Sequence, residues 1–206
     1  LLFVTCILLM FIGRVSWKYI FLLGLLGLVV FAGLIAFGQL YPDSGLVRVD
    51  TWVSRVDEFL NSEDGGFQVQ QAKIAIANGG VIGEGPGNSI IRNFLPYAHA
   101  DFIYAIICEE YGLFGGTVIL ALYVLLFLRN VKLVTKSPKA FGAFLAIGLS
   151  LMLTVQALAN IAVNVNLVPA TGLTLPMISM GGTSMLFTCV ALGMILSVSK
   201  FIESLE

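Results

Sequence analysis

Long apolar runs alternate with short polar turns along this chain, the pattern of a protein that crosses a membrane several times. A helix needs about 20 residues to cross the roughly 30 Å hydrocarbon core of a bilayer, and the first apolar run, residues 1–12, is too short. No small-residue cleavage site follows that run, so we interpret it as the tail of a cut helix in a longer protein. The sequence predicts an all-α polytopic membrane protein, a transmembrane helix bundle with further spans at about 17–38, 102–128, 141–163 and 184–198.

Composition supports the membrane class. Hydrophobic residues make up 58% of the chain and charged residues 11%, with a mean hydropathy of +0.98. A soluble domain is about half apolar and roughly a quarter charged. The net charge of -1 comes without any run of Lys or Arg, so no nucleic-acid partner is expected. The three cysteines lie inside apolar segments without metal-binding spacing, and we interpret them as small buried residues.

Basic residues in the short turns predict the orientation of the chain. They gather at 14–18, at 129–139 and at Lys200, whereas the loop 164–183 has no Lys or Arg. By the positive-inside rule the basic turns are cytoplasmic. The long polar region 40–100 and the loop 164–183 are therefore expected to be extracytoplasmic, together with any chemistry.

The long outer region has helical patterning of its own. Its apolar residues recur at the spacing of an amphipathic helix that lies along the membrane surface, at Trp52, Val53, Val56, Phe59 and Leu60, and Arg55, Asp57 and Glu58 are on the other face. A second short helix is predicted from Phe67 to Asn78. It is expected to stop at Gly79 and Gly80, because glycine readily adopts the left-handed conformation at a helix end.

The glycine string Gly83, Gly85 and Gly87 has two interpretations. Bare backbone N–H groups can approach phosphate oxygens closely, as in phosphate-binding loops. A nucleotide fingerprint requires a βαβ unit, which the apolar spans around this string do not provide, so no nucleotide cofactor is expected. The string is either a plain tight turn or a turn that also contacts a lipid-linked pyrophosphate, with Lys73 and Arg92 as candidate counter-charges.

His99 and Asp101 lie just before an apolar run. In an extended segment residues i and i+2 point the same way, so both side chains could face one cavity. Asp101 could alternatively cap the helix expected to start at Phe102. Desolvation disfavours the charged form of a carboxylate at the edge of an apolar region, and a raised pKa suits a general base.

Two adjacent carboxylates, Glu109 and Glu110, are predicted about 12 Å further along the same helix. Adjacent helical residues differ by about 100° in direction, so at most one can face a cavity. Gln156, Asn160 and Asn164 form a polar ridge on the next span that could meet the other by interhelical hydrogen bonds. We interpret these groups as structural or cavity-lining polar residues.

Two motifs resemble a known family. NGGVIGEGPGNSIIRNFLPYAHADFIYAIICEEYGLFGG, at 78–116, and GLTLPMISMGGTS, at 172–184, closely resemble the SEDS family (shape, elongation, division and sporulation) in order and separation. Thr174 favours the division type over the elongation type, which more often has Pro there. The chain departs from the family pattern at Tyr97, Ala100 and Met180, where Glu, Thr and Tyr are common.

The resemblance implies a peptidoglycan glycosyltransferase of about ten spans in the bacterial cytoplasmic (inner) membrane. Its substrate would be lipid II, an undecaprenyl-pyrophosphate-linked disaccharide peptide, and its partners a class B penicillin-binding protein and other divisome proteins. The family's essential aspartate carries over to Asp101, the expected general base. The expected substrate-binding residues are Lys73, Gly85, Asn88, Ser89, Arg92, Pro96, His99, Pro176, Ser179, Gly181 and Gly182.

Charge on the departing pyrophosphate requires compensation, either by basic side chains or by a divalent cation such as Mg or Mn. Two other classes of function stay open from the sequence. A transporter of lipid-linked precursors would depend more on Glu109 or Glu110 than on Asp101. A non-enzymatic divisome scaffold would tolerate loss of the Asp101 carboxylate. Within the enzymes, an elongation-type member or an O-antigen-type polymerase or ligase is the nearest rival.

Overall fold

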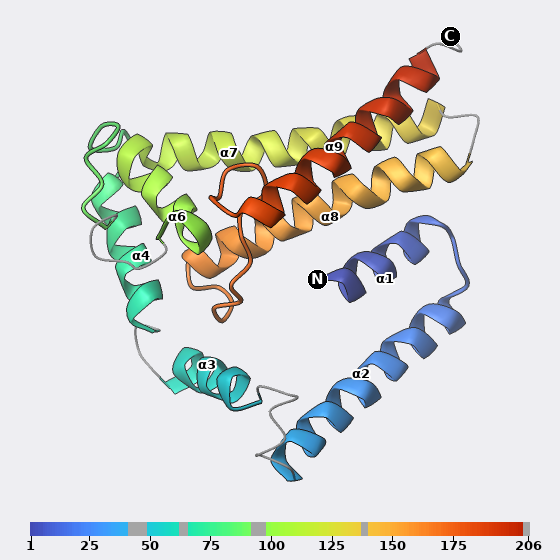
Figure 1. Cartoon of the computed structure of the whole chain (residues 1–206), viewed down its shortest axis with the longest axis horizontal. Coiled ribbons are helices and arrows are strands. Elements are labelled where there is room, and N and C mark those ends of the chain that lie inside the picture. Colours follow the sequence, from blue (N-terminus) through green and yellow to red (C-terminus); the bar gives the residue numbers. More distant parts are fainter. Residues whose placement is uncertain (41–48, 62–65, 92–97, 137–139, 204–206) are drawn as a thin grey trace.

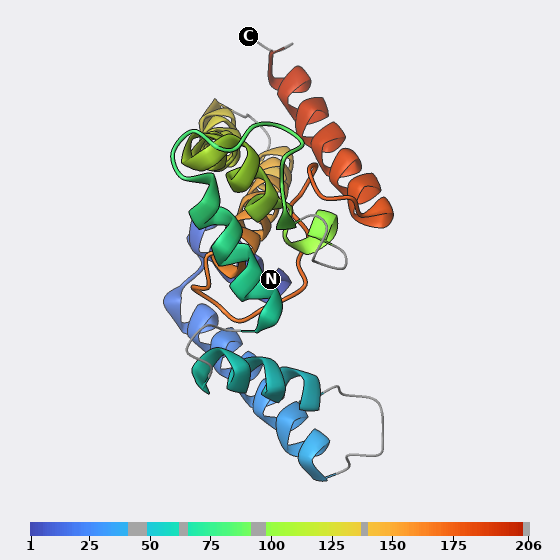
Figure 2. The ribbon, with the colours of Figure 1, turned by 90° about the vertical axis from the view of Figure 1, so that its left-hand side faces the viewer.

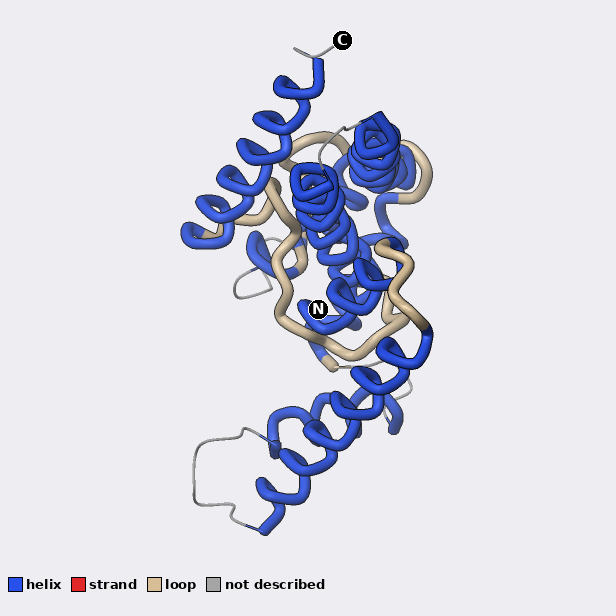
Figure 3. The backbone as a smooth tube through the Cα atoms, turned by 90° about the vertical axis from the view of Figure 1, so that its right-hand side faces the viewer, coloured by secondary structure: helices blue, strands red, loops and turns tan. Residues whose placement is uncertain are grey.

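The computed structural model describes residues 1–40, 49–61, 66–91, 98–136 and 140–203, and each of these is helical or lies in a turn or loop (Figures 1 and 3). The all-α fold predicted from hydropathy is confirmed. The helices are α1 (Leu2–Ile12), α2 (Trp17–Leu40), α3 (Val49–Asn61), α4 (Phe67–Gly79), α6 (Ala98–Asp101), α7 (Ile103–Lys136), α8 (Ala140–Asn164) and α9 (Gly182–Glu203).

Four helices are long and apolar enough to cross a membrane. They contain the segments Trp17–Phe37, Ile103–Leu133, Ala140–Asn164 and Gly182–Ile202, while α1 is a shorter apolar helix. Helices α7, α8 and α9 run side by side, and α8 contacts both of the others as well as α1 (Figures 1 and 2). Helix α2 contacts α1 and α3. Its apolar side chains are exposed along the span, as expected of a helix surrounded by lipid or other protein.

Helix α7 is broken at Gly112, whose φ of 68° and ψ of -169° are not helical. The sequence predicts one uninterrupted span here, so the break is a correction. It separates an outer leg, residues 103–111, from a long leg, residues 113–136, which turns away from it (Figure 1). Glycine suits this position because its φ is positive and an added Cβ would lie 2.4 Å from the Val81 carbonyl oxygen.

The turn that follows α4 replaces the hydrogen bonds lost at the break. The N–H groups of Leu113 and Phe114 donate to the carbonyl oxygens of Gly80 and Val81, at 2.9 and 3.4 Å. In return, the N–H groups of residues 84 and 85 donate to the carbonyl oxygens of residues 109 and 110, both at 3.0 Å. Irregular backbone is tolerated among membrane helices where other protein groups satisfy it.

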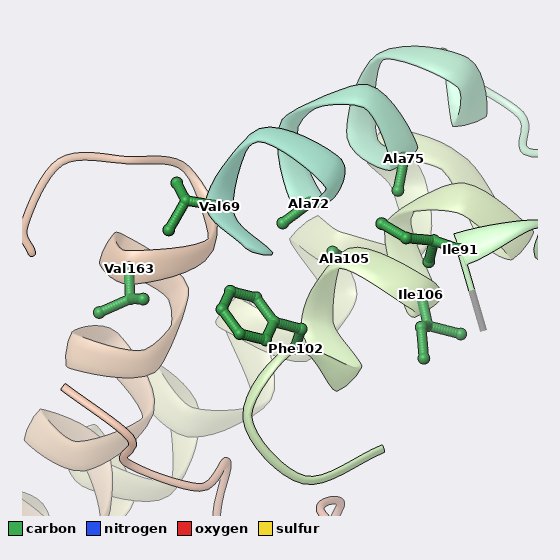
Figure 4. Packing of buried hydrophobic residues seen from close by; sticks show 8 residues of the cluster. All are labelled: Val69, Ala72, Ala75, Ile91, Phe102, Ala105, Ile106 and Val163. Atoms are coloured by element: carbon green, nitrogen blue, oxygen red, sulfur yellow. The ribbon is translucent and has the colours of Figure 1, made fainter. Parts of the chain in front are cut away.

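A core of small and apolar side chains joins α4 to the outer ends of α7 and α8. Figure 4 shows Ala72 and Ala75 of α4 above Ala105 of the outer leg, with Phe102 and Val163 beside them. Alanines let the backbones approach closely, as small residues do between membrane helices. Closest of all is Gly79, where an added Cβ would lie 1.9 Å from the Cys108 carbonyl oxygen. This packing fixes the outer leg, and the residues just before it, against α4.

We expect Gly79→Val to destabilise the protein by roughly 1–3 kcal/mol or more, because the group it would strike is backbone and cannot rotate away. Thermal unfolding in detergent measures the effect. Gly24→Ala is the matched control, since nothing lies within 4 Å of a Cβ at Gly24. Equal melting temperatures for Gly79→Val and the unaltered protein would show that α4 does not pack on the outer leg this closely.

Candidate active site

Asp101 ends α6 at the outer end of the bundle, where five separate parts of the chain meet. Its side chain is half-buried and lines a cavity of about 40 Å³. The cavity wall includes Arg55 of α3, Gln68 of α4, Asn160 of α8 and Gly172 of the loop 165–181. An added Cβ on Gly172 would lie 3.7 Å from Asp101 Oδ2, so the loop backbone passes close to the carboxylate.

Two asparagines of α8 hold the backbone of Asp101. The Nδ2 groups of Asn160 and Asn164 donate to the Asp101 carbonyl oxygen at 2.8 and 3.3 Å. Asn164 Oδ1 accepts from the Ala105 N–H at 3.3 Å, and both asparagines are buried. These bonds satisfy the backbone where α6 passes into α7, and they fix the point from which the carboxylate projects.

The polar ridge of α8 therefore does not meet Glu109 or Glu110, and that prediction is wrong. Besides holding Asp101, Asn160 donates to the Leu173 carbonyl oxygen at 2.6 Å, and Gln156 Nε2 donates to the Thr174 carbonyl oxygen at 2.9 Å. The ridge is polar because it binds the backbone of the irregular loop 165–181.

The carboxylate of Asp101 makes no hydrogen bond to any residue that the structure describes, so the helix-cap interpretation is not supported. Burial raises the pKa of this carboxyl above its ordinary value, and the positive charge of Arg55 lowers it in part. A partly desolvated carboxylate without hydrogen-bond donors is a stronger base than an exposed one. This is the property that a general base requires.

Arg55 is the site residue that the sequence reading misses. Its Nη1 donates to the Ala170 carbonyl oxygen at 3.0 Å, which joins α3 to the outer loop. The amphipathic pattern placed Arg55 on the solvated face of its helix. In the sequence, Arg55 is recognisable only as a positive charge on the polar face of an amphipathic helix. The residues near it give no indication that it binds a loop more than 100 positions away.

The loop 165–181 is supported from inside. The Met180 N–H donates to the His99 carbonyl oxygen at 3.0 Å and so joins the loop to α6, while the His99 side chain is half-buried. Pro176 is buried, and its carbonyl oxygen accepts from the Tyr123 hydroxyl. Ser179 Oγ accepts from the Leu175 N–H at 2.7 Å. Pro176 and Ser179 therefore shape the loop and do not line the Asp101 cavity, and their role in binding substrate stays a prediction.

The glycine turn is also structural, at the positions where its groups are described. The Gly85 N–H is engaged with the break in α7, so it is not a free donor for a phosphate. Asn88 Nδ2 donates to the Glu84 carbonyl oxygen at 2.9 Å, and the hydroxyl of Ser89 donates to the Glu109 carboxylate. None of these three residues lines the Asp101 cavity. Their contact with substrate stays a prediction.

Glu109 is buried, with 1% of its surface exposed, and its carboxylate accepts three hydrogen bonds. The donors are the Ser89 hydroxyl and the N–H groups of Ile90 and Ile91, the last two at 3.2 and 3.4 Å. Glu110 is half-buried. Both residues precede the break at Gly112 and so lie on the outer leg. They are therefore not placed along the long leg, which begins after the break. The Glu109 carboxylate thus joins α7 to residues 89–91 of the turn.

The remaining predicted residues lie elsewhere. Lys73 is half-buried on α4 and does not line the Asp101 cavity. Gly181 precedes α9, and Gly182 is its exposed first residue. Arg92 and Pro96 lie outside the described residues, so their roles stay predictions.

Comparison with known proteins identifies the family. A family profile described as cell cycle protein, of the FtsW, RodA and SpoVE type, matches residues 1–204. The chain belongs to the FtsW/RodA/SpoVE family.

Individual relatives agree with this assignment. Stage V sporulation protein E of Bacillus subtilis is 36% identical over 198 residues, covering 96% of this chain and 52% of the relative. The probable peptidoglycan glycosyltransferase FtsW of Nitrosococcus halophilus is 38% identical over 203 residues, covering 96% and 50%. The chain thus spans about half the length of these relatives.

A solved structure has the same fold. It is described as "Structural coordination of polymerization and crosslinking by a peptidoglycan synthase complex", and it matches with a TM-score of 0.63 and 26% identity. The match covers 94% of this chain and 52% of that chain. The helix arrangement of Figure 1 is therefore similar to that of a chain in this solved structure.

Among the described residues that line the Asp101 cavity, one carboxylate, that of Asp101, is available to bind a divalent cation. Among the residues that the structure describes, no group of three or more His, Cys, Asp or Glu side chains is placed to hold a metal ion. Magnesium is usually held by one or two carboxylates together with substrate phosphates. The described side chains do not form such a site by themselves.

We expect Glu109→Gln to destabilise the protein by roughly 1–3 kcal/mol, because the new NH₂ group would face a backbone or hydroxyl donor in a buried position. Thermal unfolding of the detergent-solubilised protein measures the loss. Glu84→Gln is the control, since Glu84 belongs to the same turn and is exposed. A Glu109→Gln variant as stable as Glu84→Gln would contradict the fastening role of the carboxylate.

Proposed function

We propose that this member of the FtsW/RodA/SpoVE family is a peptidoglycan glycosyltransferase that polymerises lipid II into β-1,4-linked glycan. The reaction takes place at the outer face of the bacterial cytoplasmic membrane during cell division. Its partners are a class B penicillin-binding protein and other divisome proteins. The observation that carries the proposal is the Asp101 carboxylate, which is half-buried in a cavity at the outer end of the bundle and accepts no hydrogen bond from the described residues.

The names of relatives and the distribution of charge support this assignment. Several relatives are named probable peptidoglycan glycosyltransferase FtsW, and the solved structure of the same fold is of a peptidoglycan synthase complex. The C-terminal part of α7, which carries Arg129 and Lys132, lies at the end of the bundle opposite to α6 (Figure 1). By the positive-inside rule Asp101 then faces away from the cytoplasm, where lipid-linked sugars would be joined.

In the proposed reaction Asp101 takes the proton from the 4-hydroxyl of the acceptor sugar. The hydroxyl oxygen attacks the anomeric carbon of the donor, and the bond from that carbon to the pyrophosphate oxygen breaks. Undecaprenyl pyrophosphate leaves with the electron pair, and the α-linked donor gives a β bond by inversion. Such a leaving group needs positive charge instead of a proton. Lys73, Arg92 and a divalent cation stay candidates for that charge.

The cavity must widen before it can hold these substrates. Its volume of about 40 Å³ suffices for water, whereas pockets for small organic ligands measure roughly 300–1,000 Å³. Its wall includes α3, the end of α8 and the loop 165–181, which come from distant parts of the chain. We propose that the donor and acceptor enter as α3 and the loop move apart.

The environment of Glu109 weighs against a transport function. A proton-coupled or substrate-coupled carboxylate inside a bundle has to change partners during the cycle. The Glu109 carboxylate already accepts three hydrogen bonds from residues 89–91. The Asp101 carboxylate lines a cavity and accepts no hydrogen bond from the described residues.

We expect Asp101→Asn to lower lipid II polymerisation about 100-fold or more, because a positioned general base contributes that much and an amide cannot accept the proton. The assay uses the complete protein, purified with its penicillin-binding partner and supplied with fluorescent lipid II. Glu110→Gln, an acidic residue on the neighbouring leg, is the control and should retain polymerisation. Equal polymer from Asp101→Asn and the unaltered protein would remove the catalytic assignment.

We also expect Asp101→Asn to be more stable than the unaltered protein at neutral pH. The pKa of Asp101 is raised in the folded protein above its ordinary value of 3.8. Protonated Asp101 therefore favours folding, a contribution fully present below the pKa of the unfolded chain and lost as pH rises through the folded-state pKa. The advantage of Asn should shrink as pH falls toward 4. Melting temperatures across this range measure it, and an advantage that grows on acidification would contradict a raised pKa.

A further inference from the structure

Arg55 connects α3 to the loop 165–181. Helix α3 packs along α2, away from the three-helix bundle (Figures 1 and 2). From α3, Arg55 reaches the Ala170 carbonyl oxygen at 3.0 Å, a contact between positions 115 apart. Arg55 also lines two neighbouring cavities, one with Asp101 and one with Glu58 and Asn166. Its guanidinium therefore stands at the junction of α3, the outer loop and the candidate base.

Among the described residues that line the cavity, Arg55 is the charged residue other than Asp101. Helix α4 contributes Gln68 to this cavity, α8 contributes Asn160, and the loop contributes residues 171–173, all of them uncharged. His99 lies on the same short helix as Asp101, and Glu58 lines the adjoining cavity. Burial raises the pKa of Asp101, and the charge of Arg55 opposes that rise.

We propose that Arg55 is a positioning residue, which holds the outer loop to α3 through Ala170 and keeps the Asp101 carboxylate ionised for its role as base. An arginine suits both tasks because its planar group carries five N–H donors in a fixed geometry. One donor can bind the carbonyl oxygen while the charge still acts on the cavity. This inference rests on the proposed transferase function and names a residue that sets its pH range.

The position of α3 and the ionisation of Asp101 are then linked. If α3 moves away from the loop, the positive charge leaves with it, and the carboxyl becomes harder to ionise. If α3 is in place, the base is ready at a lower pH. The cavity must widen for substrate to enter. Movement of α3 during this widening would therefore also change how readily Asp101 ionises.

Three variants separate charge from hydrogen bonding. Arg55→Gln removes the charge and keeps an N–H donor, Arg55→Lys keeps the charge, and Arg129→Gln removes an equal charge from the exposed far end of α7. Polymerisation of fluorescent lipid II is measured against pH with the complete protein and its partner. We expect the acid limb of Arg55→Gln to move to higher pH, with a several-fold lower rate on the acid side that recovers at alkaline pH. Arg55→Lys and Arg129→Gln should keep the limb of the unaltered protein.

A second measurement does not depend on turnover. Carbodiimides react with protonated carboxyl groups, so modification of Asp101, followed by mass spectrometry, should persist to higher pH in Arg55→Gln than in Arg55→Lys. If Arg55→Gln does not fold, Arg55→Ala and Arg55→Met provide other charge-free variants. Identical pH profiles for the charge-free variants and Arg55→Lys, in both measurements, would overturn the proposal. A different outcome would separate the two proposals. If the unaltered protein makes no polymer, yet modification of Asp101 persists to higher pH in Arg55→Gln than in Arg55→Lys, the transferase assignment is wrong and the effect of Arg55 on Asp101 stands.

Discussion

Backbone hydrogen bonding at the outer end of the bundle is the constraint on which the site depends. The chain leaves helical geometry there between α6 and α7, at Gly112 and along the loop 165–181. Each exposed backbone group must find a partner, because lipid offers none. Asn160 and Asn164 bind the carbonyl oxygen of Asp101, and the turn after α4 fills the break in α7. These bonds use polar groups of neighbouring segments and leave the Asp101 carboxylate available.

Two carboxylates on adjoining segments have different roles because they have different donors. Glu109 accepts hydrogen bonds from one hydroxyl and two backbone N–H groups, which make it part of the scaffold. Asp101 is less buried but has no such donors among the described residues, so desolvation raises its pKa. A count of acidic residues in the apolar segments cannot separate the two. The two carboxylates differ because the fold brings hydrogen-bond donors to Glu109 and, among the described residues, none to the carboxylate of Asp101.

The sequence predicts the parts of this structure that depend on local pattern. Hydropathy locates the spans, the amphipathic stripe locates α3, and Gly79 and Gly80 mark the end of α4. It fails where a residue's partner is distant. The apolar residues on both sides of Gly112 continue the pattern of one helix, so the break gives no local signal. The polar ridge of α8 is visible in the sequence. Its hydrogen-bond acceptors in the loop are backbone carbonyl groups, which every residue has, so the sequence does not show which loop residues they belong to. Arg55 looks solvated because its acceptor lies 115 positions away.

Assembly from distant segments also explains why the site is closed and how it can open. Five parts of the chain contribute to the cavity wall, and two of them, the end of α8 with Asn160 and the short helix α6, are joined by buried hydrogen bonds. Helix α3 is joined to the loop near Ala170 by a hydrogen bond from an exposed arginine. A single exposed hydrogen bond contributes little free energy compared with a buried network. The wall is therefore weakest between α3 and the loop, on the side of the cavity where the charge that acts on Asp101 is located.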